Sequence, residues 1–161
     1  GNFAQGVRQD PLKEKDLSLG VLICFEAIFP ELTRDLSREG ANLLVNITND
    51  AWFGLTSAPY QHLSMAVFRS VETGIPMIRA ANTGFSAFIG TDGHILSKTP
   101  LFVEAVLDGS IPVLPAKPTI YTRSGDLFAG GLVLISLLNL LFSFRKWLKK
   151  KSKTHNARSV K

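Results

Sequence analysis

The chain has 161 residues, which is enough for one ordinary domain with little left over. It is 45% hydrophobic and 19% charged, which is too apolar and too weakly charged for a disordered chain. The single cysteine, Cys24, excludes an intrachain disulfide framework. No group of cysteines and histidines has the spacing of a structural zinc site, so we expect no metal.

The net charge of +5 comes from the C-terminal tail. Eight of the 18 Lys and Arg residues lie between Arg145 and Lys161, where there is no Asp or Glu. The other ten stand against all 13 acidic residues, so the body of the chain carries a net charge of −3. Because phosphate binding needs positive charge on the folded surface, we do not expect a nucleic-acid partner.

The apolar runs and turn residues predict strands that alternate with helices early in the chain and pair as hairpins later. This order is typical of an α/β fold with a mixed sheet. In chain order we predict a loop (1–17), a strand (18–25), a helix opened by Pro30 and ended by Gly40, a strand (41–47), a loop (48–59), a helix (60–73), a strand (76–81), a hairpin around Thr91, Asp92 and Gly93, and a strand (101–111).

Residues 127–144 form an uncharged apolar run in which Asn139 is the only amide. A helix of this length reaches roughly 27 Å, close to the ~30 Å hydrocarbon core of a bilayer. The segment RKWLKKKSK follows at once, and Lys/Arg-rich flanks stay cytoplasmic. We therefore predict a linker (119–126), a transmembrane helix (127–144) and a basic cytoplasmic tail (145–161), with the body on the opposite side. The alternative is a buried core helix of a soluble protein.

The first residues lack a basic segment followed by an apolar one, which is the pattern of a secretory signal peptide. A body that lies outside the cytoplasm needs a route across the membrane. We therefore expect this chain to be the end of a longer protein that has earlier membrane spans.

Cys24 lies at the end of a predicted strand, just before a turn and a helix. An α/β fold exposes side chains at this place, and the following helix points backbone N–H groups at a developing anion. Cys24 is therefore a candidate nucleophile, and the backbone N–H of Phe25 is a candidate oxyanion donor. The alternative is a buried structural cysteine.

Other polar residues have two readings. Glu26 is either an active-site carboxylate within a hydrogen-bond network or a helix N-terminal carboxylate favoured by the dipole. His62 could pair with Cys24 or could be a packing residue of its helix. Arg69 and Glu72 have the spacing of a local ion pair. Asn46, Asn49 and Asp50 are polar groups at a predicted strand end, and they either face a site or form turns.

These motifs resemble the nitrilase (carbon–nitrogen hydrolase) superfamily. The general signal is the strand-end cysteine in GVLICFEAIFPE. A narrower signal, comprising NITNDAWFG, the pair Gln61-His62, RAANTG and TIYTRSGD before an apolar span, is similar to the membrane-bound lipoprotein N-acyltransferases within that superfamily. The resemblance covers residues 3–144. It implies that residues 1–118 are the C-terminal part of a nitrilase-like α-β-β-α sandwich with a mixed sheet.

By this resemblance, Cys24 is the nucleophile of a Glu–Lys–Cys triad and Glu26 is a supporting active-site carboxylate. Trp52 and Phe53 match a loop that borders the lipid entrance. The triad's Glu and Lys lie upstream of the cysteine in the family, and no motif of this chain matches them. We therefore expect the chain alone to be inactive.

The activity implied is transfer of a fatty acyl group from a phospholipid to the N-terminal amine of a diacylglyceryl-cysteine lipoprotein, through a thioester. It requires no cofactor. We expect a monomer in the bacterial inner membrane, with its catalytic part on the extracytoplasmic side. Two alternatives remain open: a membrane-tethered amidase of the nitrilase type, and a non-catalytic membrane-anchored domain.

Overall fold

The structure is a computed structural model that describes residues 9–115 and 117–158. The chain divides into two units, the first ending at Gly125 and the second beginning at Asp126.

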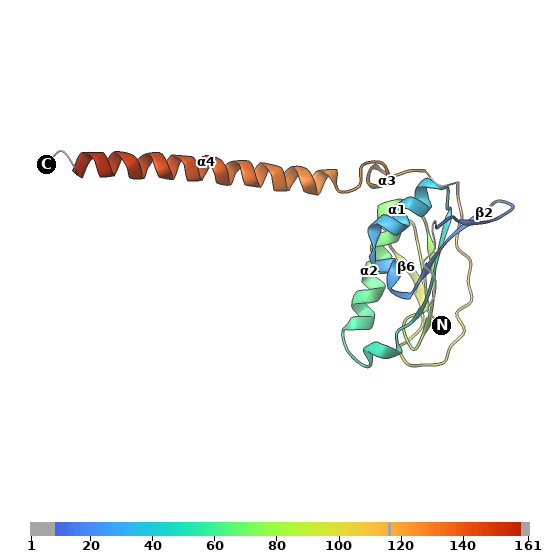
Figure 1. The fold of residues 1–161 in the computed structure, drawn as a ribbon. Helices are drawn as coiled ribbons and strands as arrows, with labels where there is room; N and C mark the ends of the chain where they lie inside the picture. The colour runs from blue at the N-terminus through green and yellow to red at the C-terminus, as the bar shows by residue number, and fades with distance from the viewer. Residues whose placement is uncertain (1–8, 116, 159–161) are drawn as a thin grey trace, which may run out of the picture. The chain divides into compact units, whose positions relative to one another are not determined.

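The first unit is built on a mixed sheet of six strands that follow one another in chain order from edge to edge (Figure 1). The three central strands are parallel, and each edge is extended by antiparallel pairing. The prediction of a mixed sheet is therefore confirmed. The strands are β1 (Leu12–Glu14), β2 (Leu17–Ile23), β3 (Leu43–Asn49), β4 (Met77–Asn82), β5 (Ala87–Ile89) and β6 (Ile95–Lys98).

Two crossover helices, α1 (Pro30–Arg38) and α2 (Ala58–Thr73), connect the parallel strands. Since successive right-handed crossovers that progress in one direction place their helices on the same side, one face of the sheet is covered. Figure 1 shows α1 and α2 together on that side. Pro30 stands in the first turn of α1, and α2 ends at Gly74, whose φ of +67° suits glycine.

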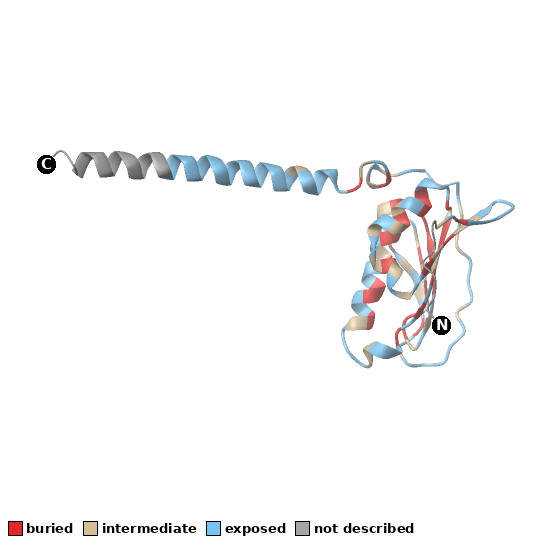
Figure 2. Ribbon diagram, viewed as in Figure 1, coloured by how far each residue is buried: buried red, intermediate tan, exposed pale blue. Residues whose placement is uncertain are grey.

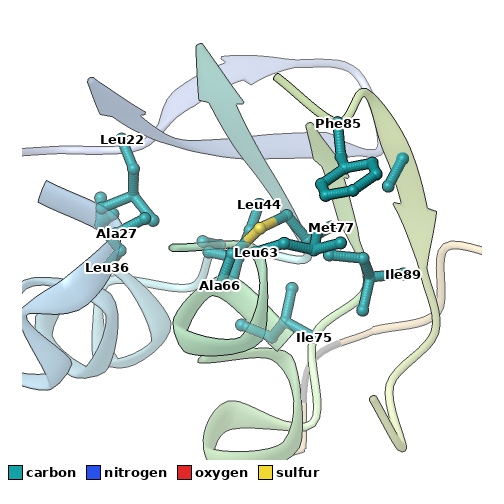
Figure 3. Close-up of a cluster of buried hydrophobic side chains, with 12 residues drawn as sticks. Leu22, Ala27, Leu36, Leu44, Leu63, Ala66, Ile75, Met77, Phe85 and Ile89 are labelled. Atoms are coloured by element: carbon teal, nitrogen blue, oxygen red, sulfur yellow. The ribbon is translucent and has the colours of Figure 1, made fainter. Parts of the chain in front are cut away.

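The hydrophobic core fills the space between the sheet and the two helices (Figure 3). Figure 2 shows the buried residues concentrated at this junction. The inward side chains of a strand alternate with outward ones, so the three central strands contribute Leu22, Leu44 and Met77. The other core members are Ala27, Leu36, Ala41, Leu63, Ala66, Ile75, Phe85, Ala87 and Ile89.

The opposite face of the sheet is apolar but largely open. Ile23 and Ile47 are 54% and 51% exposed there. Part of this face lies beneath the segment that follows β6, because a Cβ added to Gly109 would meet the Phe88 ring at 3.2 Å. One sheet with helices on one face is half of the predicted α-β-β-α sandwich.

Two predicted elements were wrong. A short edge strand, β1, forms within the predicted loop 1–17. Residues 101–111 were predicted as a strand, but they form no strand and follow a turn at Phe102, whose φ of +55° is incompatible with a continuing ladder. The predicted linker 119–126 contains a short helix, α3 (Ile120–Ser124), capped by Thr119.

The second unit contains α4 (Leu127–Arg158). Within it, Leu127–Trp147 is the one helix of the described chain that is long and apolar enough to cross a membrane, with a mean hydropathy of 2.2. The helix continues past residue 144, where the predicted span ended. Its apolar side chains, such as Leu134 and Phe142, are exposed.

Candidate active site

Cys24 lies directly after β2, at the carboxyl end of a central parallel strand. It begins a 3₁₀ turn, η1 (Cys24–Ile28), and its φ is +51°. A non-glycine residue in this left-handed region costs about 1–3 kcal/mol and persists only where its surroundings hold it. The side chain is half-buried. A strained strand-to-helix turn of this kind is how α/β enzymes present a nucleophile.

Glu26 belongs to the same turn, and its side chain hydrogen-bonds to the backbone there. Its Oε2 accepts a hydrogen bond of 2.7 Å from the backbone N–H of Ile23. Gln9 Nε2 lies 3.5 Å from that oxygen and donates to Val21 O at 3.0 Å. The carboxylate thus belongs to a hydrogen-bond network around the turn, which is one of the two readings of the sequence.

The aromatic residues predicted at the site face different ways. The rings of Phe25 and Phe53 lie 5.9 Å and 5.7 Å from the imidazole of His62. Phe53 belongs to the 3₁₀ turn η2 (Ala51–Phe53), whereas its neighbour Trp52 is 84% exposed. Of the two residues assigned to a lipid entrance, therefore, only Trp52 is free to meet a substrate without losing a packing contact seen here.

A buried polar cluster lies below the turn, between the sheet and α2. We define it as Asn46, Asp50, His62 and Arg79, none of them more than 3% exposed. Asn46 and Arg79 are register partners on β3 and β4, and Arg79 Nη1 donates to Asn46 Oδ1. Arg79 Nη2 donates to Asp50 Oδ2 at 2.9 Å. Asp50 Oδ1 lies 3.0 Å from His62 Nδ1.

The pair Asp50 and Arg79 carries the charge of this cluster. Burial would raise the pKa of Asp50, but the hydrogen bond with His62 and the charge of Arg79 outweigh it and lower the pKa below its ordinary 3.8. Burial lowers the pKa of Arg79, and the charge of Asp50 opposes this shift.

The ionised Asp50 fixes the proton of His62. A carboxylate can only accept hydrogen bonds, so His62 Nδ1 carries a hydrogen and donates a hydrogen bond to Asp50 Oδ1. Thr48 Oγ1 donates to the same carboxylate oxygen at 3.0 Å. Among the described residues, the His62 Nε2 atom is buried without a hydrogen-bond partner.

The structure brings some of the sequence candidates together and separates others. His62 pairs with Asp50, and no contact described here joins it to Cys24. Asn49 serves turn chemistry, since its Oδ1 accepts from the N–H of Ala51 at 3.1 Å. The predicted ion pair of Arg69 with Glu72 is confirmed at 2.8 Å.

Arg79 is the residue that sequence reasoning missed. Its signal is present in the predicted strand 76–81, because a charged side chain on the covered face of a central strand requires a buried partner. The partner, Asp50, is 29 residues away along the chain. Residue pattern alone does not reveal such a pairing.

A strand-end cysteine on a mixed sheet with one helical layer defines an α/β protein with a candidate cysteine nucleophile. Residues 4–120 match the carbon–nitrogen hydrolase family. The match spans well over half of the chain, and the chain belongs to this family.

Curated relatives extend the comparison to the apolar C-terminal part. The chain is 49% identical over 146 residues to the apolipoprotein N-acyltransferase of Geobacter metallireducens, covering 91% of this chain and 28% of that protein. The corresponding protein of Rhodopseudomonas palustris is 46% identical over 148 residues, covering 91% and 27%. The chain thus spans little more than a quarter of the length of these relatives.

Solved structures agree on the fold. A carbon–nitrogen hydrolase from Helicobacter pylori superposes with a TM-score of 0.54 at 17% identity, over 60% of this chain and 41% of that one. Nit3 of Saccharomyces cerevisiae, a nitrilase superfamily member, gives 0.50 at 20% identity, over 60% and 38%. The predicted partial nitrilase-like fold is therefore confirmed.

Proposed function

We propose that this chain is part of an apolipoprotein N-acyltransferase in which Cys24 carries the fatty acyl group. The observation that carries the proposal is the strained turn at Cys24, in a chain that is 49% identical to an enzyme of that name. The turn holds a thiol at the end of a parallel strand, beside the backbone N–H groups of a 3₁₀ turn. This is what a nucleophile that passes through an acyl intermediate needs.

The reaction has two steps. Cys24 Sγ attacks the ester carbonyl of a phospholipid, the bond to the glycerol oxygen breaks, and the lysophospholipid alcohol leaves with the thiol proton. The N-terminal amine of the lipoprotein then attacks the thioester carbonyl. The bond to sulfur breaks, the departing thiolate takes a proton from the amine and becomes the thiol again, and an amide remains. No redox step or cofactor is involved.

Two further residues of the turn, Phe25 and Glu26, have a role in this scheme. The N–H of Phe25 stabilises the oxyanion of both tetrahedral intermediates, and Glu26 fixes the turn through Ile23. The base that takes the thiol proton and the lysine that completes the triad are contributed by a part of the enzyme outside this chain, as the superfamily resemblance implies. The apolar face around Ile23 and Ile47 is where that part packs.

The apolar helix α4 supports a membrane setting. We propose that residues 127–144 span the bacterial inner membrane, with the basic tail in the cytoplasm and Cys24 on the extracytoplasmic side. The donor is then a phospholipid of the same membrane. Trp52, exposed in η2, contacts that lipid at the site entrance.

The test uses the full-length polypeptide that carries this chain, purified in detergent and incubated with phospholipid but no acceptor. The peptide containing Cys24 should gain one fatty acyl mass, which neutral hydroxylamine removes. Cys24→Ser should abolish the modification, because the thiolate is a far stronger nucleophile than a hydroxyl group at neutral pH.

Adding a diacylglyceryl lipopeptide separates the alternatives. Transfer to its free N-terminal amine, and none to an N-acetylated control, supports the acyltransferase. Rapid transfer to water without the lipopeptide supports a hydrolase of the amidase type. A Cys24 peptide that stays unmodified in an enzyme that still turns over contradicts the thioester.

A further inference from the structure

Within the described part of the chain, Asn46 is the member of the buried polar cluster that hydrogen-bonds to the turn at Cys24. Asn46 Nδ2 donates to two carbonyl oxygens, Leu22 O at 3.0 Å and Cys24 O at 3.3 Å. Both carbonyls belong to the place where β2 ends and η1 begins. Asn46 is fully buried, so its bond to Leu22 O does not compete with water, and its bond to Cys24 O is partly buried.

The second of these bonds fixes more than a carbonyl. The C=O of Cys24 and the N–H of Phe25 belong to one planar peptide unit, in which they point in opposite directions. Whatever orients the oxygen therefore orients the N–H. The Phe25 N–H is the oxyanion donor of the proposed reaction, so its direction is set by the bond from Asn46.

The peptide unit between Leu22 and Ile23, two units before that of Cys24 and Phe25, is held on both sides. Asn46 binds its oxygen, Leu22 O, and the Glu26 carboxylate binds its hydrogen, Ile23 N–H, at 2.7 Å. Side chains thus fix the Leu22–Ile23 and Cys24–Phe25 peptide planes, which lie on either side of the Ile23–Cys24 peptide. Bonds before and after the Ile23–Cys24 peptide hold the short segment in which Cys24 keeps a φ of +51° although it carries a Cβ.

Asn46 is itself held in place. Its Oδ1 accepts from Arg79 Nη1, and the second nitrogen of the same guanidinium binds Asp50. An amide that accepts from a cation must present its NH₂ group on the other side, toward Leu22 and Cys24. The planar arginine fork therefore determines which way the Asn46 amide faces.

We propose that Asn46, oriented by Arg79 and Asp50, is the positioning residue that sets the direction of the Phe25 N–H in the oxyanion site. This inference rests on the proposed function, since it assumes that Cys24 is the nucleophile. Asn46 does not touch the substrate. It acts through the Cys24–Phe25 peptide.

The test replaces Asn46 in the full-length polypeptide and measures single-turnover acylation of Cys24 by phospholipid. Asn46→Ala removes both bonds. Asn46→Asp keeps an acceptor for Arg79 but has no N–H for Cys24 O, so it reports on the turn even where Asn46→Ala fails to fold. Both variants should acylate about 10- to 100-fold more slowly, with KM for phospholipid within twofold of wild type.

Asn42→Ala is the matched control. The Asn42 side chain also bridges backbone groups, donating to Asp16 O at 2.7 Å and accepting from Ser18 N at 2.8 Å, but at the opposite end of β2. Its acylation rate should stay within twofold of wild type. An equal loss of acylation rate in Asn42→Ala and Asn46→Asp would show that both substitutions act only through the stability of the fold. This result would overturn the proposal.

Hydrogen exchange gives a readout that does not depend on activity. Amides of residues 23–28 should exchange faster in Asn46→Asp, while those of β3 and β4 keep their protection. Unchanged exchange in this turn, or faster exchange over the whole sheet, would overturn the inference. A wild-type enzyme that forms no acyl adduct at Cys24 contradicts the proposed function, and the exchange pattern still decides whether Asn46 holds the turn.

Discussion

The carboxylate of Asp50 lies against the backbone of Gly84, where no side chain fits. A Cβ at residue 84 would lie 2.3 Å from Asp50 Oδ2 and 2.7 Å from its Cγ. The space is limited because Asp50 cannot move away without leaving Arg79 and His62. The glycine of the RAANTG motif is therefore explained by a close approach to a buried charge.

Gly84→Ala should accordingly destabilise the protein. Overpacking alone costs about 1–3 kcal/mol, and displacing Asp50 from Arg79 adds to this, because an uncompensated buried charge is expensive. Chemical denaturation of the full-length polypeptide in detergent measures the change. We also expect acylation of Cys24 to slow, since the same displacement frees Arg79 and Asn46.

A double-mutant cycle provides the control. Asp50→Gly removes the three side-chain atoms that the new Cβ would meet. In that background Gly84→Ala should cost much less than it does alone, giving a coupling of about 1 kcal/mol or more. Additive losses would show that the Gly84 position is intolerant for a reason other than Asp50.

Acid should weaken the stabilisation that the buried polar cluster gives to the folded state. The pKa of Asp50 lies below 3.8 because its hydrogen bond with His62 and the charge of Arg79 outweigh burial. A carboxyl group whose pKa is lowered on folding contributes stability that is present above its unfolded pKa and is lost as pH falls through its folded pKa. The contribution of Asp50 is therefore present in full near neutrality and decreases below pH 3.8.

Asp50→Asn makes this measurable. The difference in free energy of unfolding between wild type and Asp50→Asn should be constant from about pH 5 to 7 and should shrink as the pH falls below 3.8. Asp92→Asn, in an exposed hairpin turn, serves as the comparison. A difference that does not shrink as the pH falls below 3.8 would mean that the charge of Asp50 does not stabilise the folded state.

The elements of this fold were predictable where local signals agree. Apolar runs located β2, β3 and β4, and Pro30 and Gly74 located the ends of the helices. The strand predicted over 101–111 failed because nothing in the local pattern shows that Phe102 turns the chain away from β6. Strand formation depends on a neighbouring strand, which a local run does not reveal.

The site was predictable in part for the same reason. Cys24 and Glu26 are separated by one residue, so their proximity in the turn can be predicted from the sequence. The pairing of Asn46 with Arg79 depends on the register of two strands. His62 was weighed as a partner of Cys24, whereas its buried partner is Asp50, 12 residues earlier in a loop.

Trp52 and Phe53 should behave differently although they are adjacent. Trp52 is 84% exposed, so Trp52→Ala should leave stability within about 0.5 kcal/mol of wild type. If it contacts the lipid, KM for phospholipid should rise. Phe53→Ala removes a ring packed on His62 and should cost on the order of 1–3 kcal/mol.

Val106→Ala serves as the control for an exposed apolar side chain outside η2, since Val106 is 96% exposed. It should change neither stability nor KM. Equal effects of Trp52→Ala and Val106→Ala on KM would contradict a specific lipid contact at Trp52.

The orientation of α4 gives the last prediction. Residues 127–144 carry no charge, eight Lys and Arg residues follow them, and the body before them is net acidic. Because short segments rich in Lys and Arg stay in the cytoplasm, the tail should lie inside and the catalytic part outside.

Reporter domains fused after Lys161 and inserted into the turn at residues 91–94 of the full-length polypeptide test this orientation. Alkaline phosphatase, which folds only outside the cytoplasm, should be active in the turn and inactive after Lys161, and green fluorescent protein should show the reverse. Activity of the same reporter at both places would mean that Cys24 and the tail lie on the same side of the membrane. In that case α4 does not cross the membrane, and the proposed orientation is wrong.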